Sequence, residues 1–311
     1  MKKRLSYFTA QLSPLDIGAL FYVLLSGLYI AIGAPHLVDI IPHVILRLGI
    51  IILIFALIYL QKLYPNTAIL FLRNLYPLAF LSFFYSETSY MKNILFHTNL
   101  DIYFSNADQY IWGFQPSLQF CKTMNQPWFN ELMNICYFSY YLITAVICIG
   151  IYMDKKHLAY KPIFIAIFSF YLYYIIYDIL PVTGPQFYFN TLPNESTPPY
   201  FFGKLMRYLL LNYEKPTGAF PSSHVGLALI LSFIAWQHHK ILFWVSIPFV
   251  IGICFATVYL KAHYAVDVLA ALITVPVFIY ISNMVYKKLL LLNTSSKRKQ
   301  VKYSQKSIFL R

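Results

Sequence analysis

Charged residues are scarce in this chain. Only 11% of its 311 residues are Asp, Glu, Lys or Arg, whereas 59% are hydrophobic. Soluble domains carry about 25% charged residues, so this composition excludes a soluble globular protein. Apolar runs of about 18 residues or more recur along the chain, and each predicts a membrane-spanning helix. We therefore expect an all-α, polytopic integral membrane protein.

Cysteine is also rare. The four cysteines form no Cys-x-x-Cys pair and no other spacing typical of metal ligands, and three of them lie inside apolar runs. This pattern argues against a disulfide framework and against a cysteine metal site. We interpret the four as small apolar packing residues: Cys121, Cys136, Cys148 and Cys254.

Acidic residues are few as well. The chain has 11 Asp and Glu against 24 Lys and Arg, which gives a formal net charge of +13. Such a balance suggests either nucleic acid or an anionic membrane surface as a partner. The cations lie in loops and tails between apolar runs, so the membrane is favoured and nucleic acid is not.

Eight apolar runs predict about eight spanning helices. They cover residues 16–34, 42–61, 67–85, 131–153, 161–180, 224–236, 241–260 and 265–286. An even number places both termini on one side, together with the basic 155–161 loop and the turn at Lys240, and the positive-inside rule makes that side cytoplasmic. The basic N-terminus also fits a signal peptide, but the many later runs favour a first spanning helix.

This topology predicts four parts of the chain. They are N-terminal transmembrane helices at 1–90, an extracytoplasmic segment at 91–130, a transmembrane domain with the chemical motifs at 131–290, and a basic cytoplasmic tail at 291–311. The 91–130 segment mixes polar and aromatic residues. It is either an amphipathic helix on the membrane surface or a lid that helps to select a substrate.

Two short motifs flank one helical hairpin. Pro221-Ser222-Ser223-His224 begins the run that ends near Trp236, and a second run from Ile241 leads to His263 and Asp267. At about 1.5 Å per residue these runs are roughly 20 and 30 Å long, so one enters the membrane and the other returns. We expect the two histidines and the aspartate to meet at the outer face.

The residue types in these motifs favour phosphoryl chemistry. His263 and Asp267 are four residues apart, which predicts one helix face and a carboxylate that activates the imidazole, although a structural helix cap fits too. Ser222 and Ser223 lie where a helix begins, and free N–H groups at such a position bind anions. His224 beside them suits a proton donor, although an interfacial histidine after a simple cap is the alternative.

Together these residues predict a two-step reaction without a metal or other cofactor. His263 attacks phosphorus to form a phospho-histidine, His224 protonates the departing alkoxide, and water or another hydroxyl then attacks the phospho-enzyme. Lys261, two residues before the nucleophile, is the first candidate to stabilise the phosphoryl oxygens. Further candidate cations are Lys215, Arg207 and Lys204, of which the last two also suit contact with lipid headgroups.

With Pro-Ser-x-His at 221–224 and His-Tyr-x-x-Asp-x-x-Ala at 263–270, the chain resembles the type 2 phosphatidic acid phosphatase superfamily. The resemblance covers about residues 131–286. It implies a six-helix-type core bundle and a phosphate ester of a membrane lipid as substrate. It also implies catalytic roles for the two histidines and the aspartate, with the first serine of the motif as a phosphate ligand.

Two departures from the family pattern point to one branch. The usual Ser-Arg pair before the nucleophilic histidine is Ala256 and Thr257, so that Lys261 would substitute for the arginine. The usual Lys-x6-Arg-Pro motif is absent, and 178–185 stands in its place. These features resemble the inositol phosphorylceramide synthase-like (inositolphosphotransferase-like) branch, which transfers phosphorylated headgroups between lipids. Asp178 would then position an acceptor hydroxyl, or cap the helix end.

Headgroup transfer of the inositol-phosphate type is thus favoured over simple hydrolysis of phosphatidic acid or isoprenyl pyrophosphate. A proton-coupled transporter or flippase would instead need charges and broken helices near the bilayer midplane, and Pro248 and Gly252 are the main breakers. An inactive scaffold is disfavoured because all three chemical residues are present. Compact loops and few cysteines favour a bacterial inner membrane.

Overall fold

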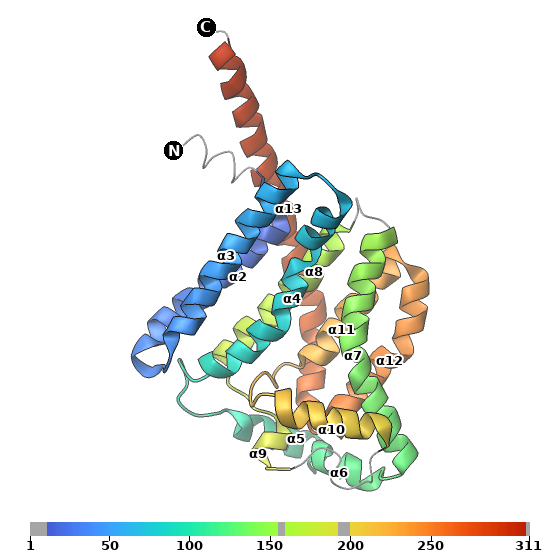
Figure 1. Cartoon of the computed structure of the whole chain (residues 1–311). Coiled ribbons are helices and arrows are strands. Elements are labelled where there is room, and N and C mark those ends of the chain that lie inside the picture. Colours follow the sequence, from blue (N-terminus) through green and yellow to red (C-terminus); the bar gives the residue numbers. More distant parts are fainter. Residues whose placement is uncertain (1–10, 155–158, 192–199, 309–311) are drawn as a thin grey trace. The chain divides into compact units, whose positions relative to one another are not determined.

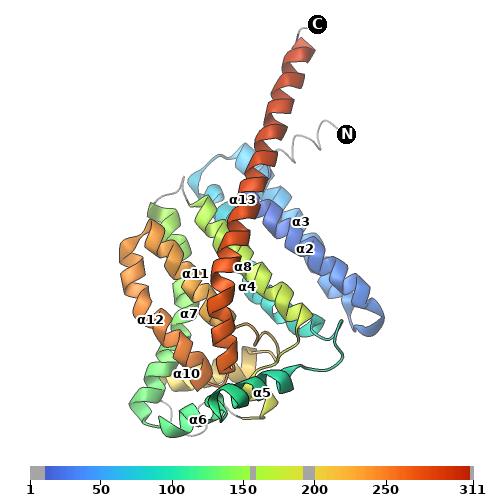
Figure 2. The same cartoon turned by 180° about the vertical axis from the view of Figure 1, so that it is seen from behind.

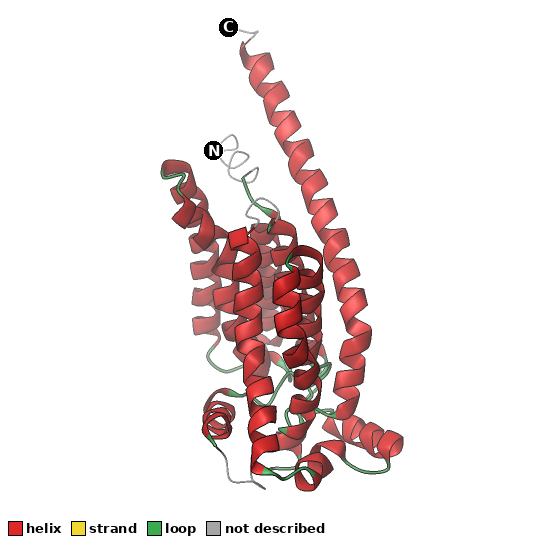
Figure 3. Cartoon of the chain, turned by 90° about the vertical axis from the view of Figure 1, so that its right-hand side faces the viewer, coloured by secondary structure: helices red, strands yellow, loops and turns green. Residues whose placement is uncertain are grey.

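The fold is entirely helical in the part of the chain that the structure, a computed structural model, describes. That part is residues 11–154, 159–191 and 200–308. Figure 3 shows helices and loops, and no strand occurs in these residues. Seven helices among them are long and apolar enough to cross a membrane. The expectation of an all-α, multi-pass membrane protein is therefore confirmed.

The seven candidate spanning helices follow the predicted runs closely. They are α2 (Pro14–Gly33), α3 (Ile40–Leu63), α4 (Thr67–Met91), α7 (Pro127–Asp154), α8 (Tyr160–Ile179), α12 (Lys240–Tyr259) and α13 (Ala265–Ile308), the last of which is apolar over Ala265–Leu292. The eighth predicted helix, α11 (Ser223–His238), forms as expected. It has only 16 residues, however, which is short of the roughly 20 that cross a bilayer. The prediction of about eight helices thus corresponds to seven candidates of spanning length and one shorter helix, α11, which forms the first half of the predicted hairpin.

Five short helices connect the long ones. They are η1 (Ala34–His36), α5 (Asp101–Trp112), α6 (Pro116–Thr123), α9 (Pro185–Tyr188) and α10 (Phe201–Tyr213). Figure 1 shows α5, α6, α9 and α10 together at one end of α7, α11 and α12. The predicted 91–130 segment is therefore helical in part, through α5 and α6.

The chain divides into two compact units. The first comprises residues 1–80 and 280–311, and the second residues 81–279. Of the helices that follow the predicted runs, α7, α8, α11 and α12 lie wholly in the second unit, and α4 from Leu81 and α13 to Ile279 contribute to it in part. The 91–130 segment belongs to this same unit.

Close helix contacts build the second unit. Figure 2 shows α13 beside α8, where the Tyr173 hydroxyl lies 2.9 Å from that of Thr274. On α12, a Cβ added at Gly252 would lie 2.4 Å from Sγ of Cys136 on α7, so that only glycine permits this approach. The helix α12 is continuous through both Pro248 and Gly252. A proton-coupled transporter would need a helix broken at such residues, and α12 is not broken at either one.

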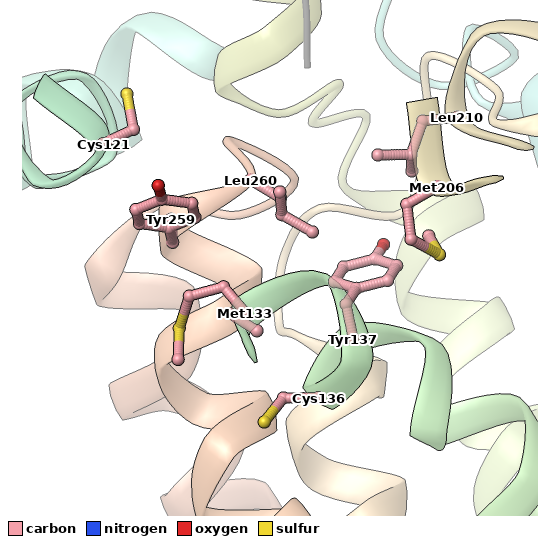
Figure 4. Packing of buried hydrophobic residues seen from close by; sticks show 9 residues of the cluster. Cys121, Met133, Cys136, Tyr137, Met206, Leu210, Tyr259 and Leu260 are labelled. Carbon is pink, nitrogen blue, oxygen red and sulfur yellow. The ribbon is translucent and has the colours of Figure 1, made fainter. Parts of the chain in front are cut away.

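A hydrophobic cluster supports the end of α12 (Figure 4). It joins α6, α7, α10 and α12 and consists of Cys121, Met133, Cys136, Tyr137, Met206, Leu210, Ala256, Tyr259 and Leu260. Figure 4 shows the Tyr137 ring between Leu260 and Met206. All four cysteines are free thiols, and two of them belong to this cluster, as expected for apolar packing residues. The cluster places the last turn of α12 immediately before the second motif.

The first unit contains a buried ion pair. Arg73 of α4 lies 2.8 Å from the Asp16 carboxylate of α2, and the Asp16 side chain is almost completely buried. Asp16 also forms a capping box with Ser13 at the start of α2. Its second carboxylate oxygen accepts a hydrogen bond from Tyr76 at 3.3 Å. An arginine inside an apolar run is thereby compensated by a partner on another helix.

Replacing Arg73 by Met should strongly destabilise the first unit. The Asp16 carboxylate would stay buried without its counter-charge, which costs about 3–5 kcal/mol. We expect a clearly lower midpoint of thermal unfolding for the detergent-purified variant. The exposed Lys62→Met on α3 is the control and should leave the midpoint unchanged. Equal midpoints for the two variants would show that this ion pair contributes little.

Candidate active site

The two predicted histidines meet in the second unit. Nδ1 of His224, the second residue of α11, lies 3.2 Å from Nε2 of His263, which is in the loop between α12 and α13. Both side chains are buried. The hairpin of α11 and α12 thus brings together two imidazoles that are 39 residues apart in sequence.

The His263 ring is oriented by a main-chain carbonyl. Its Nδ1 lies 2.7 Å from the carbonyl oxygen of Ala219. Because a carbonyl only accepts, Nδ1 carries the proton and Nε2 keeps its lone pair, which faces His224. The expected hydrogen bond to Asp267 is not formed, because His263 precedes α13 and the two residues do not share a helix face. The distance from Nδ1 to the Asp267 carboxylate is 3.6 Å.

Asp267 caps the start of α13. It is completely buried, and its carboxylate accepts the N–H of Tyr264 at 2.7 Å. This is a cap on the first turn of the helix, one of the two roles that the sequence left open. The same carboxylate remains close enough to His263 to stabilise a positive charge on its ring.

The start of α11 differs from the predicted anion site. Ser222 caps the helix, as expected, and its hydroxyl accepts the N–H of Val225 at 3.4 Å. The N–H of Ser222 donates to the carbonyl of Asp267 at 3.1 Å, and that of Ser223 donates to the Tyr177 hydroxyl at 3.0 Å. Both amides that were expected to hold a phosphate therefore have protein partners. Their role in the structure is to fix the start of the helix that carries the first histidine.

The predicted cations occupy different environments. Lys261 is buried in the loop before His263 and has a left-handed backbone with φ of 62°. Lys215 lies exposed after α10. On α10 itself, Arg207 is half-buried and Lys204 is exposed. Only one of these four cations is therefore part of the buried loop that carries the nucleophile.

The segment that replaces the family's first motif crosses this site. Asp178 is buried in the last turn of α8, and the chain then runs through Gly184 beside the loop of the second motif. The carbonyl of Val182 accepts the N–H of Ala219 at 3.1 Å, and Gln186 donates to the carbonyl of Lys261 at 2.9 Å. The segment thus joins the two chain stretches that hold His263 from either side.

Some residues of the site were not singled out from the sequence. The rings of Tyr137 and Tyr140 pack against the His224 ring, with centroids 4.8 and 4.4 Å apart. Glu214, after α10, accepts a hydrogen bond from Tyr85. The chain has only 11 acidic residues, and this scarcity is the sequence feature that could have identified Glu214 as a candidate site residue.

Burial decides the protonation state of the nucleophile. It lowers the pKa of His263 to about 4, and the Ala219 carbonyl and the Glu214 carboxylate offset only part of this effect. Burial also raises the pKa of Glu214. At neutral pH the His263 ring is neutral, as a nucleophile requires. In the described part of the chain no group of three or more His, Cys, Asp or Glu side chains has the arrangement of a metal site.

Gly184→Ala should reduce the reaction rate by about 100-fold, the effect of a small displacement of catalytic groups. The backbone has φ of 94°, and a Cβ would lie 2.6 Å from the carbonyl oxygen of Ala262, so the loop before His263 must shift. Gly113→Ala is the matched control, since Gly113 also has positive φ but open space around it. Equal initial rates for the two variants would contradict this assignment.

The pH dependence of the reaction should reflect the low pKa of His263. The nucleophile loses its lone pair when it is protonated, so kcat/KM should fall as the pH drops through about 4 and should not fall near 6.5. The measurement is kcat/KM against pH from 3.5 to 8, with folding checked at each pH. An acidic limb near 6.5 would mean that His263 is not the buried, neutral group described above.

Comparison with known proteins adds a family to this geometry. A family model described as the PAP2 superfamily matches residues 107–281, which is more than half of the chain. The match includes both motifs, the helices that carry them and the second half of α5. No curated protein and no solved structure matches the chain. Members of this superfamily are phosphatases and phosphotransferases, which supports a lipid phosphatase or phosphotransferase type of function. With this match and the two facing histidines, the chain belongs to the PAP2 superfamily.

Proposed function

We propose that this protein transfers a phosphorylated headgroup, of the inositol-phosphate type, from one membrane lipid to another through a phospho-histidine on His263. The observation that carries the proposal is the pair of facing ring nitrogens, 3.2 Å apart, with the proton of His263 held on Nδ1 by a carbonyl. This geometry leaves one nucleophilic nitrogen opposite one proton donor, and the family match supplies the phosphoryl chemistry.

The first step uses the two rings in turn. The phosphoryl group enters between them, and the rings separate to admit it. Nε2 of His263 forms a bond to phosphorus and the bond from phosphorus to the lipid oxygen breaks. His224, protonated on both ring nitrogens when the anionic substrate is bound, gives one of these protons to that oxygen and becomes neutral. The Asp267 carboxylate, 3.6 Å from Nδ1, stabilises the positive charge that the phosphorylated ring acquires.

The second step reverses these roles. An acceptor hydroxyl gives its proton to His224 and its oxygen bonds to phosphorus. The bond from phosphorus to nitrogen then breaks and returns the lone pair to His263. The proposed phosphate ligands are Lys261 and the side-chain hydroxyl groups of Ser222 and Ser223, whose main-chain N–H groups have partners within the protein. Lys215 and Arg207 would meet the headgroup, and Asp178 would position the acceptor.

Burial supports transfer over hydrolysis. His263 is 2% exposed and His224 is 8% exposed, so little water reaches the phospho-enzyme in this geometry. Thr257 stands where the family pattern has an arginine, and its carbonyl accepts the N–H groups of Ala262 and His263 at 3.0 and 3.1 Å. Hydrolysis of a lipid phosphate by the same two histidines is the second candidate function.

We also propose that the site faces the extracytoplasmic side of a cell membrane, of the bacterial inner-membrane type, with both termini cytoplasmic. The support is the distribution of Lys and Arg along the chain. Part of the basic loop that enters this argument, residues 155–158, lies outside the described residues.

A lipid panel tests the proposal. Purified protein, His263→Ala and the control His97→Ala, an exposed residue, would receive phosphatidic acid, isoprenyl pyrophosphate, phosphatidylglycerol phosphate, and phosphatidylinositol with ceramide or diacylglycerol. We expect a new headgroup-bearing lipid without free phosphate, and a base-stable, acid-labile phosphoprotein, both absent in His263→Ala alone. EDTA should leave the rate unchanged, because the steps above use only protein groups.

The other outcomes are equally definite. Free phosphate without a new lipid would establish hydrolysis and remove the transfer proposal. Activity lost in EDTA and restored by magnesium would overturn metal independence. Equal activity of His263→Ala and wild type would remove the phospho-histidine and favour the proton-coupled transporter, which is then tested by flux measurements in proteoliposomes.

A further inference from the structure

The helix α5 turns its acidic side chains inward. Asp101 and Asp108 are 1% and 0% exposed, while Tyr103 and Tyr110 of the same helix are 68% and 91% exposed. The two aspartates are seven residues apart, which places them on one helix face. A helix whose acids only served solubility would show the opposite pattern, because an unpaired buried carboxylate is costly. The inward carboxylates of α5 therefore need partners in the protein.

Asp108 holds the first turn of α13. Its two carboxylate oxygens accept the N–H groups of Ala265 and Val266, each at 2.9 Å. These donors belong to the helix start, where N–H groups have no partner within the helix and where a negative charge is favourable. Burial raises the pKa of Asp108 and the two N–H groups lower it. Ala265, the first of the two residues that Asp108 holds, lies two positions after His263.

Asp101 holds the same loop from the other side. Its carboxylate accepts the N–H groups of Thr183 and Gly184, both at 2.9 Å, and the hydroxyl of Tyr264 at 3.1 Å. The segment that contains Gly184 in turn lies against Ala262. The carboxylate therefore links the crossing segment to the residue that follows His263.

One aromatic side chain of α5 also contacts the residues around the site. Phe104 lies three residues after Asp101 on the same helix face. Its ring stacks on Tyr264 with centroids 6.4 Å apart, and it contacts Phe220 at 4.5 Å, next to the first motif. A single face of α5 thus contacts both motifs of the site.

We propose that Asp101 and Asp108 are positioning residues, which hold the loop around His263 in the geometry for attack on phosphorus. They touch neither histidine and act through five donors, four N–H groups and one hydroxyl. The expectation that these two aspartates affect a reaction rate rests on the proposed function. On this proposal the 91–130 segment supports the loop around His263 in a fixed position, in contrast to a lid that opens.

The variants Asp101→Asn and Asp108→Asn test this role. An amide of the same size keeps one acceptor but sets an NH2 group against a main-chain N–H, so the loop loses part of its support. We expect kcat to fall about 10- to 100-fold with KM changed less than about twofold. The rate of phospho-histidine formation in a single turnover should fall by the same factor. Asn106→Ala, exposed on the same helix, is the control.

A second measurement is independent of activity. Hydrogen–deuterium exchange of the peptide that covers 260–268 should be about tenfold faster in both Asn variants than in wild type, with the thermal midpoint little changed. Unchanged exchange together with an unchanged kcat would overturn the proposal. So would a loss of kcat no greater than the loss of folded protein. If His263→Ala is active, the proposed function fails. The exchange result still tests whether Asp101 and Asp108 hold the loop in place.

Discussion

The hydrogen bond from His263 Nδ1 to the Ala219 carbonyl is the interaction on which the site depends. It sets the tautomer, and with it the position of the only lone pair on the ring. Neither residue lies in a helix, so the bond exists only because neighbouring elements hold two loops at the required distance. Asp267, which the motif alone marks as the orienting group, contributes mainly a helix cap and a nearby charge.

Main-chain hydrogen bonds do most of this positioning. A buried loop has few waters to bind its N–H and C=O groups, so each of them must find a protein partner. The carbonyl of Thr257 accepts the N–H groups of Ala262 and His263, and the carbonyl of Asp267 accepts that of Ser222 in the first motif. The Asp108 carboxylate of α5 accepts two further N–H groups at the start of α13. The catalytic loop is therefore a junction at which several helix ends satisfy one another.

Packing between helices makes that junction possible. Gly252 lets α12 approach α7, and the cluster around Tyr137 and Leu260 fixes the height at which α12 ends. From there the chain reaches His263 in three residues after Leu260, one of which, Lys261, has a left-handed backbone. Apolar contacts far from the reacting atoms thus determine where the nucleophile lies, because the loop is too short to adjust by itself.

The amino-acid sequence alone determined the helical class, the approximate bounds of the spanning helices, and the meeting of His224 and His263. These follow from hydrophobic periodicity and hairpin length, which are local properties. Tertiary structure alone decided which atoms pair. The Arg73–Asp16 contact, the Ala219 carbonyl on His263 and the carboxylates of Asp101 and Asp108 join residues from 44 to 163 positions apart. No local pattern encodes such pairs, because they result from satisfying every buried polar group at once in the folded chain.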